Sequence, residues 1–374
     1  MLDRDVTQLS EPYPAAMRAE DPSLLRLAGP LGLDLAKPVS LGDEICGDLD
    51  LAVRGIGWWI AYPDIDRQVR IFLSDYLVAC TRAVPNNLIE ARVERLELDH
   101  AVEDYRQWMS RLLAGRQPED AAPRSAYEEL SDHRVRTHLA GALRAWASTL
   151  DCVGGCIIGV AGLPSSLVKA DLGKALKSLD LNSPGNQVLT QLRADLKQAE
   201  ASAGPPGWRE WLLGMRHTDV HRGRRTVVWV GNADGDGVAS FDLRLPIQPE
   251  LTDVDAIVQA GGISAATFAG PAADMLDELS TTVGTYASDA CGILTELWHA
   301  RRADPRLLPQ SPRQWTQPSG LITPPTFRGF PNVMTPASQV MGFTLSPEGE
   351  RRYRAAALLK PDSADARPDP SVWS

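Results

Sequence analysis

Residues 208–225 read Trp-Arg-Glu-Trp-Leu-Leu-Gly-Met-Arg-His-Thr-Asp-Val-His-Arg-Gly-Arg-Arg, and this segment carries an apolar helix face into a cationic end. The apolar side chains recur at steps of three and four, which is the spacing of a helix with one side against a core. They are Trp208, Trp211, Leu212 and Met215. The pattern predicts a helix from about Pro206 to Gly223, with Gly223 as its C-cap.

The flanking sequence predicts the elements on either side of this helix. Gly204-Pro-Pro-Gly207 forms a tight connection before it. After it, two runs of β-branched and apolar residues, 226–230 and 238–243, enclose a glycine-rich segment and predict a β-hairpin at about 226–245. The apolar stripe of residues 271–301 predicts a long closing helix.

Helical spacing also extends towards the N-terminus. Apolar residues in 43–83 predict two helices or one kinked helix, interrupted near Pro63. Residues 86–113 predict a further helix, and the segment 115–123, rich in glycine, proline and acidic residues, ends it.

The central part of the chain is predicted to be helical as well. A long helix runs from about Ser125 to Cys152 and continues through a glycine-rich stretch to Gly162. Shorter helices start near Ser165 and Ser183, where Ser183-Pro184 has the form of an N-cap followed by proline at the first helical position.

These patterns predict a mostly α fold: an up-and-down helical bundle with additional N-terminal helices and a small β-hairpin insertion. Composition divides the chain into four segments, because proline- and glycine-rich runs separate the helical stretches. They are an extended N-terminal segment at 1–42, an N-terminal helical region at 43–120, a helical domain at 121–303 and a proline-rich C-terminal tail at 304–374.

The overall charge restricts how such a protein binds polyanions. A formal net charge of -10 argues against broad electrostatic binding of nucleic acid, so a polyanion is expected to be held locally. The charged N-terminus and the absence of an uninterrupted long apolar run predict a cytoplasmic protein without membrane contact. Five cysteines are expected to be buried free thiols: Cys46, Cys80, Cys152, Cys156 and Cys291.

The spacing from Arg216 through the polar His217 to His221 resembles the R-x4-6-H motif of HEPN-domain proteins (higher eukaryotes and prokaryotes nucleotide-binding). The resemblance covers about residues 124–302. Many HEPN domains are metal-independent ribonucleases of toxin or antiviral-defence systems, and they are helical bundles with a composite dimeric site. The resemblance therefore implies a homodimeric endoribonuclease that acts on RNA, uses no cofactor or metal ion, and has an antitoxin or defence-system protein as a partner.

The resemblance also implies a role for each residue. Arg216 clamps the scissile phosphate, His221 is the general base or acid, and His217 orients His221 or shares its role. Arg222, Arg224 and Arg225 hold flanking phosphates. The residue types suit this chemistry, because histidine exchanges protons near neutral pH and a guanidinium binds phosphate in a bidentate manner.

Other interpretations of the same residues stay open. Residues 216–225 also suit a solvated cationic helix end favoured by the helix dipole, or a catalytically silent scaffold or sensor subunit that binds a nucleotide, RNA or a partner protein there. A third possibility is an interaction protein that recognises its partner through the proline-rich tail. His217 and His221 have the spacing of a zinc pair, but Thr218 stands where a metalloprotease has glutamate.

Two details limit the motif. A second match, Arg95 to His100, has Leu96 where the HEPN family has a polar residue, and its sequence is that of an ordinary charged amphipathic helix. On a regular helix, moreover, Arg216 and His221 point about 140° apart. A working site therefore requires a helix break at Asp219-Val220 or two copies that face each other across a two-fold axis.

Overall fold

The computed structural model describes residues 22–48, 67–113, 126–222, 228–234, 237–249, 268–304 and 307. Eight α-helices, one 3-10 turn and three strands make up this part of the chain. In order they are α1 (Pro22–Leu31), α2 (Ala36–Asp48), α4 (Arg67–Leu113), α5 (Ala126–Ala161), η4 (Leu167–Lys169), α6 (Leu172–Asn182), α7 (Gln187–Ala203), α8 (Trp208–Arg222), β1 (Val228–Asp234), β2 (Gly237–Pro246), β3 (Phe268–Pro271) and α10 (Ala272–Ala303). The prediction of a mostly helical protein with a β-hairpin is confirmed.

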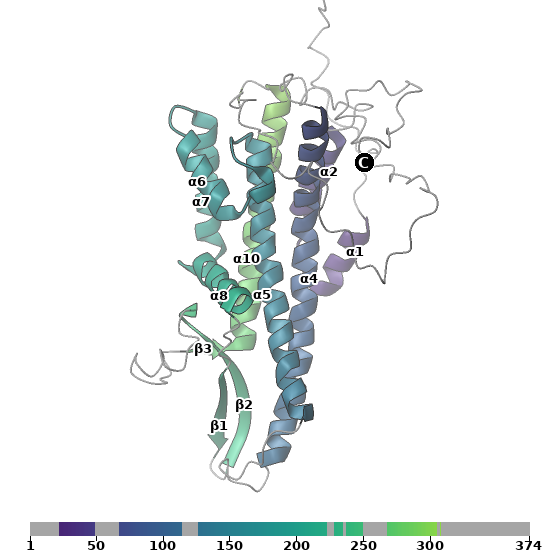
Figure 1. Ribbon diagram of the computed structural model, residues 1–374, viewed down its shortest axis with the longest axis vertical. Coiled ribbons are helices and arrows are strands. Elements are labelled where there is room, and N and C mark those ends of the chain that lie inside the picture. Colours follow the sequence, from purple (N-terminus) through teal and green to yellow (C-terminus); the bar gives the residue numbers. More distant parts are fainter. Residues whose placement is uncertain are drawn as a thin grey trace, which may run out of the picture.

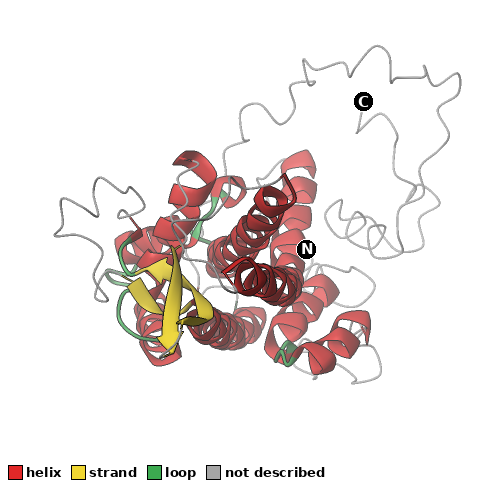
Figure 2. Cartoon of the chain, turned by 90° about the horizontal axis from the view of Figure 1, so that it is seen from below, coloured by secondary structure: helices red, strands yellow, loops and turns green. Residues whose placement is uncertain are grey.

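The two longest helices, α4 and α5, lie side by side along the long axis of the molecule (Figure 1). Helices α1 and α2 flank them on one side, α6, α7 and α8 lie on the other, and α10 packs against α2, α5 and α7. Seen end-on, the small sheet lies at the margin of the helices (Figure 2). One hydrophobic cluster contains buried residues from every described α-helix, so these helices share a core.

Glycines let α4 and α5 approach each other closely. A Cβ atom at Gly155 of α5 would lie 2.7 Å from the sulfur of Cys80, and one at Gly159 would lie 2.5 Å from a methyl carbon of Leu77. Side chains of α4 therefore occupy the space that larger residues in α5 would fill. Helix α5 continues through the glycine-rich stretch after Cys152, and the close packing of α4 explains why glycine occupies these positions.

Helix α4 is longer than the sequence predicts. Separate helices were expected on the two sides of residues 84–85, but one helix spans Arg67–Leu113 with Pro85 inside it. Proline costs about 3 kcal/mol in a helix interior. Its neighbours Val84 and Leu88 are buried on the core side, at 0% and 2% exposure, and their packing outweighs this cost.

The expected extended segment at 1–42 is also wrong for its described part, because α1 and α2 are helical from residue 22 onwards. Apolar residues between the prolines supply the packing: Leu35, Val39 and Leu41 are buried in the shared core. Pro38 is tolerated because it lies in the first turn of α2, where backbone N–H groups have no helical partner. Residues 1–21 lie outside the described part of the chain.

Two smaller corrections concern the α6–α7 connection and the sheet. Ser183 is the C-cap of α6 rather than the N-cap of α7, and its hydroxyl donates a hydrogen bond to the Leu179 carbonyl at 2.6 Å. Asn186 caps α7 instead, accepting a hydrogen bond from the Leu189 amide at 3.1 Å. The hairpin of β1 and β2 is antiparallel as predicted, and β3 joins it through a pairing with β2 that the sequence did not indicate.

One long, apolar helix is buried in the core. Residues Glu129–Ala161 of α5 are long and apolar enough to cross a membrane by length and composition, but 78% of the apolar window is buried inside the protein. A core helix passes the same test, and the packing of α5 against α4 and α10 accounts for its composition.

Candidate functional site

Helix α8 is anchored to the body of the protein by the residues that the sequence placed on its core face. Trp208, Leu212 and Met215 are buried, at 7%, 0% and 7% exposure. The indole of the half-buried Trp211 donates a hydrogen bond to the Pro246 carbonyl at 3.0 Å, which ties α8 to the end of β2. The helix begins at Trp208, two residues later than expected, because Gly207 adopts the left-handed φ of 86°.

Arg216 extends from α8 to α5, where it pairs with a carboxylate. Its Nη1 lies 2.9 Å from Oδ2 of Asp151, and the two side chains are 38% and 25% exposed. The guanidinium is therefore oriented by one partner and still accessible to solvent. Burial raises the pKa of Asp151 above its ordinary value, and the positive charge of Arg216 offsets this effect only in part.

A second ion pair lies next to the first. Asp171 is the N-cap of α6, and its carboxylate lies 2.6 Å from the Lys174 Nζ. Burial acts to raise the pKa of Asp171, but hydrogen bonds from Lys174 and the charge of Arg216 bring it below its ordinary value. The charge of Arg216 on α8 thus acts on a carboxylate of α5 and on the one that caps α6, while the Asp171–Lys174 pair is local to the start of α6.

The histidines and the remaining arginines occupy the last turns of α8 and the segment that follows. His217 is exposed, next to Arg216 in the chain. His221 and Arg222 belong to the final turn of α8, but their side chains lie outside the described part of the structure, as do residues Arg224 and Arg225. The structure therefore places the backbone of Arg216, His217 and His221 on one helix and the side chain of Arg216 against Asp151.

The helix does not break where a monomeric site would require it. Helix α8 continues through Asp219 and Val220 to Arg222. Five steps of a regular helix separate Arg216 from His221, so their side chains leave the axis about 140° apart. His217 and His221 are four residues apart and share a face. Of the two arrangements predicted for a working site, the one within a single chain is therefore wrong.

Asp151, the hydrogen-bonded partner of Arg216, is a residue that sequence reasoning missed, as are the neighbouring Asp171 and Lys174. A signal for it exists, because Asp151 is the single charged residue between Arg144 and Lys169, in an apolar part of the sequence. A carboxylate in such a position requires a cationic or hydrogen-bonding partner when it is partly buried. The sequence does not say which of many arginines supplies it.

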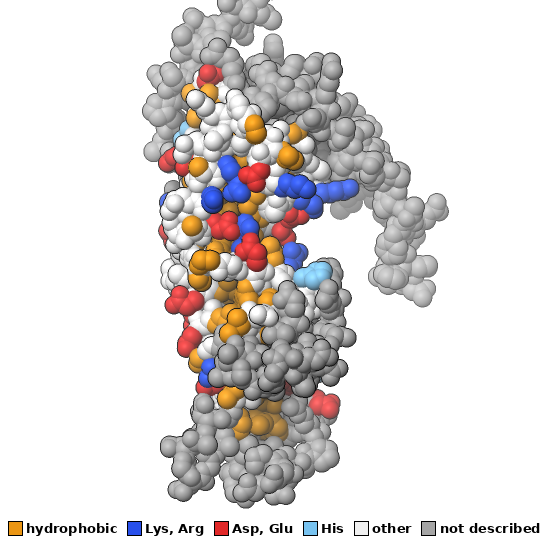
Figure 3. Space-filling view, turned by 90° about the vertical axis from the view of Figure 1, so that its left-hand side faces the viewer, with side chains coloured by type: hydrophobic (Ala, Val, Ile, Leu, Met, Phe, Trp, Pro, Cys, Tyr) orange, Lys and Arg blue, Asp and Glu red, His pale blue; other side chains and the backbone are white. Residues whose placement is uncertain are grey.

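Charges on the face formed by α6, α7 and α8 are mixed rather than uniformly basic (Figure 3). The ion pairs on these helices within the described ranges include Arg193–Asp180 at 2.6 Å, Arg209–Glu200 at 2.9 Å, Lys174–Asp171 at 2.6 Å and Arg216–Asp151 at 2.9 Å. The described residues of this face therefore do not form a uniformly basic surface.

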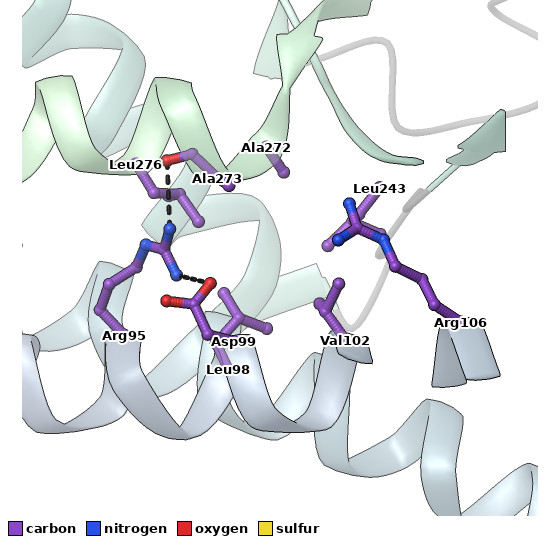
Figure 4. Close-up of a pocket in the computed structure, with 9 residues that line it drawn as sticks. All are labelled: Arg95, Leu98, Asp99, Val102, Arg106, Leu243, Ala272, Ala273 and Leu276. Atoms are coloured by element: carbon purple, nitrogen blue, oxygen red, sulfur yellow. Dashed lines mark hydrogen bonds and ion pairs between the residues drawn. The ribbon is translucent and has the colours of Figure 1, made fainter. Parts of the chain in front are cut away.

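A pocket between α4, β2 and the start of α10 contains the arginine of the second sequence match (Figure 4). Arg95 is 2% exposed, donates to the Ala273 carbonyl at 3.2 Å and pairs with Asp99. Its Nε lies 3.2 Å from Asp277, in an ion pair without hydrogen-bond geometry. Arg95 thus braces α4 against α10.

The second arginine of this pocket also has a structural role. Arg106 donates to the Phe241 carbonyl at 2.6 Å and to the Asp242 carboxylate at 2.9 Å. The adjacent Tyr105 and Trp229 stack with ring centroids 4.4 Å apart. These contacts dock the hairpin on the lower part of α4 (Figure 1). The guanidinium groups of the pocket are committed to protein partners rather than available for a ligand.

Thiol and metal chemistry receive little support from the described residues. All five cysteines are free, and burial raises the pKa of Cys152 to about 11 and that of Cys80 to about 12, so that thiolate is scarce near neutral pH. In the described ranges, no three His, Cys, Asp or Glu side chains are grouped so that they could hold a metal ion.

The fold and site define a helical-bundle protein with a partly exposed arginine, paired with a carboxylate, near the end of one helix. Comparison with known proteins finds no matching family model, no matching curated protein and no matching solved structure.

Proposed function

We propose that this protein is a metal-independent endoribonuclease of the HEPN type, in which two copies bring Arg216 of one α8 and His221 of the other to the same phosphate. The observation that carries the proposal is Arg216: it is held in one orientation by Asp151 at 2.9 Å, stays 38% exposed, and directly precedes the exposed His217. An oriented, accessible guanidinium is suited to binding a phosphate.

In this proposal the groups divide the reaction between them. Cleavage of RNA without metal requires a base that removes the 2′-hydroxyl proton, an acid that protonates the 5′-oxygen, and a cation for the developing phosphorane charge. His221 serves as base or acid, His217 orients it or shares the role, and Arg216 stabilises the charge. Arg222, Arg224 and Arg225 hold neighbouring phosphates.

Dimer formation follows from the regular course of α8. Because Arg216 and His221 diverge on one unbroken helix, a second copy must supply the missing partner in the proposed site. The active species is then a homodimer in which the two α8 helices approach the symmetry axis. Sedimentation at assay concentration tests this, and a fully active monomer contradicts it.

The decisive experiment for the chemistry is cleavage of single-stranded RNA in EDTA. The expected products carry 2′,3′-cyclic phosphate or 3′-phosphate ends, because the 2′-hydroxyl is the nucleophile. Strict dependence on added Mg²⁺ or Zn²⁺ contradicts the mechanism. Toxicity on expression, relieved by His221→Ala but not by His100→Ala, is the corresponding result in cells.

A second candidate function rests on the same ion pair. A carboxylate already neutralises Arg216, and this arrangement also suits a catalytically silent subunit that uses the end of α8 to bind a nucleotide, RNA or a partner protein. RNA binding that depends on Arg222, Arg224 and Arg225, with no cleavage of any RNA supplied, favours this candidate over the ribonuclease. Toxin, defence-system and cytoplasmic roles are part of the ribonuclease proposal.

A further inference from the structure

A cluster of buried charges joins α2 to the C-terminal part of α10, on residues that the proposed ribonuclease site does not use. Glu44 and Asp48 lie one turn apart on α2 and are 8% and 5% exposed. They face Trp298, His299 and Arg302 of α10.

One guanidinium nitrogen serves both carboxylates of this cluster. The Nη2 of Arg302 lies 2.7 Å from Glu44 Oε2 and 2.7 Å from Asp48 Oδ2. The Trp298 indole donates to the same Asp48 oxygen at 2.6 Å, and the His299 Nε2 lies 3.3 Å from Glu44 Oε2. The other oxygen of Asp48 is buried without a hydrogen-bond partner. No described group donates to that oxygen, so burial opposes a negative charge on it.

The charges of the cluster do not balance when both carboxyl groups are ionised and His299 is neutral. Two negative charges then face one arginine, and a buried excess charge is costly. Protonation of one carboxyl group leaves a single balanced ion pair. The surroundings of the two carboxyl groups decide which one takes the proton, because different environments give neighbouring titratable groups different pKa values.

The surroundings favour the proton on Asp48. Burial raises the pKa of Asp48, and Arg302 and Trp298 offset this only in part. Burial acts on Glu44 in the same sense, but Arg302 and His299 bring the pKa of Glu44 below its ordinary value. Glu44 therefore keeps the ion pair with Arg302 while Asp48 titrates.

We propose that Asp48 is a proton-operated latch: proton uptake by its buried carboxyl group holds α2 more firmly against α10, and proton release loosens this contact.

Further charged groups lie on the described parts of the helices packed against α2. On α10, Arg301 donates to the Gly159 and Val160 carbonyls of α5 at 3.1 and 2.7 Å, and Asp304 is the C-cap of the helix. On α4, the Arg82 side chain lies against Gly42 of α2.

Two groups on α2 itself complete this environment. Asp43 precedes Glu44 in the chain. At the other end of the interface, Lys37 pairs with Asp289 at 2.9 Å, and this exposed pair supplies a matched control.

The sign of the pH effect follows from the directions of the two pKa shifts. A carboxyl group whose pKa is raised in the folded state stabilises the fold at low pH, and this contribution is lost as the pH rises from its ordinary value of 3.8 through the raised value. Glu44 has the opposite sign: its contribution is present above its ordinary value of 4.5 and is lost as the pH falls through the lowered pKa. The contribution of Asp48 is therefore lost on raising the pH above 3.8, whereas that of Glu44 is lost on lowering the pH below 4.5.

Hydrogen exchange of α2 amides in the full chain tests the latch. Between about pH 4 and pH 8, after correction for intrinsic exchange, protection of α2 relative to α7 should fall as the pH rises, by up to about tenfold for each unit by which the Asp48 pKa is raised. Asp48→Asn, which keeps an oxygen for Trp298, should make α2 protection high and independent of pH. Asp289→Asn should preserve the wild-type pH dependence.

Three results would overturn the latch. The first is a flat wild-type profile, which decides the question even if Asp48→Asn does not fold. The second is loss of α2 protection in Asp48→Asn, as expected for Glu44→Gln. The third is disappearance of the pH dependence in His299→Gln, which would assign the proton to His299. None of these measurements uses RNA, so the latch and the ribonuclease are tested separately.

Discussion

The two arginines that precede a histidine by five residues, Arg95 and Arg216, lie in opposite environments. Arg95 is 2% exposed and reaches two carboxylates and a backbone carbonyl, so that it joins α4 to α10. Arg216 is 38% exposed and has one described carboxylate partner, Asp151 of α5. Identical spacing thus accompanies a structural brace in one case and an accessible cation in the other.

The difference shows that the spacing of the motif does not by itself indicate a functional site. Both arginines lie on helices and both histidines are near them in the chain, so the spacing describes a helix and little more. The surrounding helices determine whether a guanidinium is available to a ligand. A function assigned to Arg216 therefore depends on its exposure and on its pairing with Asp151, and these are the properties that mutations can test.

The largest expected effect is on RNA cleavage, and it should distinguish His221 from His100. In the proposed ribonuclease, His221→Ala should lower the cleavage rate by about 10² to 10⁴-fold, the usual contribution of a general acid or base. RNA binding should stay near the wild-type level, because His221 contributes to the chemical step. Single-turnover cleavage and a filter-binding assay measure the two quantities.

His100→Ala is the matched control for this comparison. His100 is an exposed residue of α4, one turn from the buried Arg95, so its removal should leave cleavage and stability unchanged. Equal losses of activity in the two variants would remove the reason to prefer the match at residues 216–221.

The two arginines should also differ in their contribution to stability, and here the buried Arg95 should have the larger effect. Arg95→Ala should lower the free energy of unfolding by about 3 kcal/mol, because it removes a buried charge from two carboxylates and a carbonyl. Arg216→Ala should cost about 1 kcal/mol or less, since its ion pair is partly exposed to solvent. Urea denaturation of the two variants measures the difference, and similar losses would mean that Arg216 is also a brace.

Asp151 tests whether the partner of Arg216 matters for activity. Asp151→Ala should lower cleavage about tenfold through loss of the oriented guanidinium. Asp151→Asn should restore only part of the activity, since an amide oxygen still accepts a hydrogen bond but carries no charge to hold the guanidinium. A rate that is unaffected in Asp151→Ala would show that the pair does not position Arg216.

The same pair predicts a pH effect. Because burial raises the pKa of Asp151, its carboxylate takes up a proton at a higher pH than an ordinary aspartate as the solution is acidified. The wild-type rate should therefore decline through that range as the charge on Asp151 is lost, and Asp151→Asn should lack this step. Parallel pH–rate profiles of the two proteins provide the test.

The smallest effect concerns the arginines beyond His221. Replacement of Arg224 and Arg225 by alanine should weaken RNA binding and reduce the slope of log affinity against log salt by about 0.7 for each phosphate that the variant no longer neutralises. Slow cleavage should persist at high protein concentration. An unchanged salt slope would mean that neither arginine binds phosphate.

Local patterns predicted several elements correctly. The core face of α8, the antiparallel hairpin and the long closing helix follow from apolar spacing of three and four or of two, which a single segment carries by itself. In the N-terminal part, the prolines led to wrong predictions of where helices end and of an extended segment. At Pro38 and Pro85 the local preference is opposed by burial of neighbouring apolar residues, and that burial depends on helices distant in the sequence.

For the candidate site, the sequence by itself determined the residue types, their order on α8 and the angle between Arg216 and His221, because a regular helix fixes the directions of its side chains. It also determined the net negative charge, which predicts that a polyanion is held locally. Only the tertiary structure decided that α8 stays unbroken, that Asp151 holds Arg216, and that Arg95 is buried. These outcomes depend on the contacts between helices that the chain brings together from distant positions, and no local spacing contains that information.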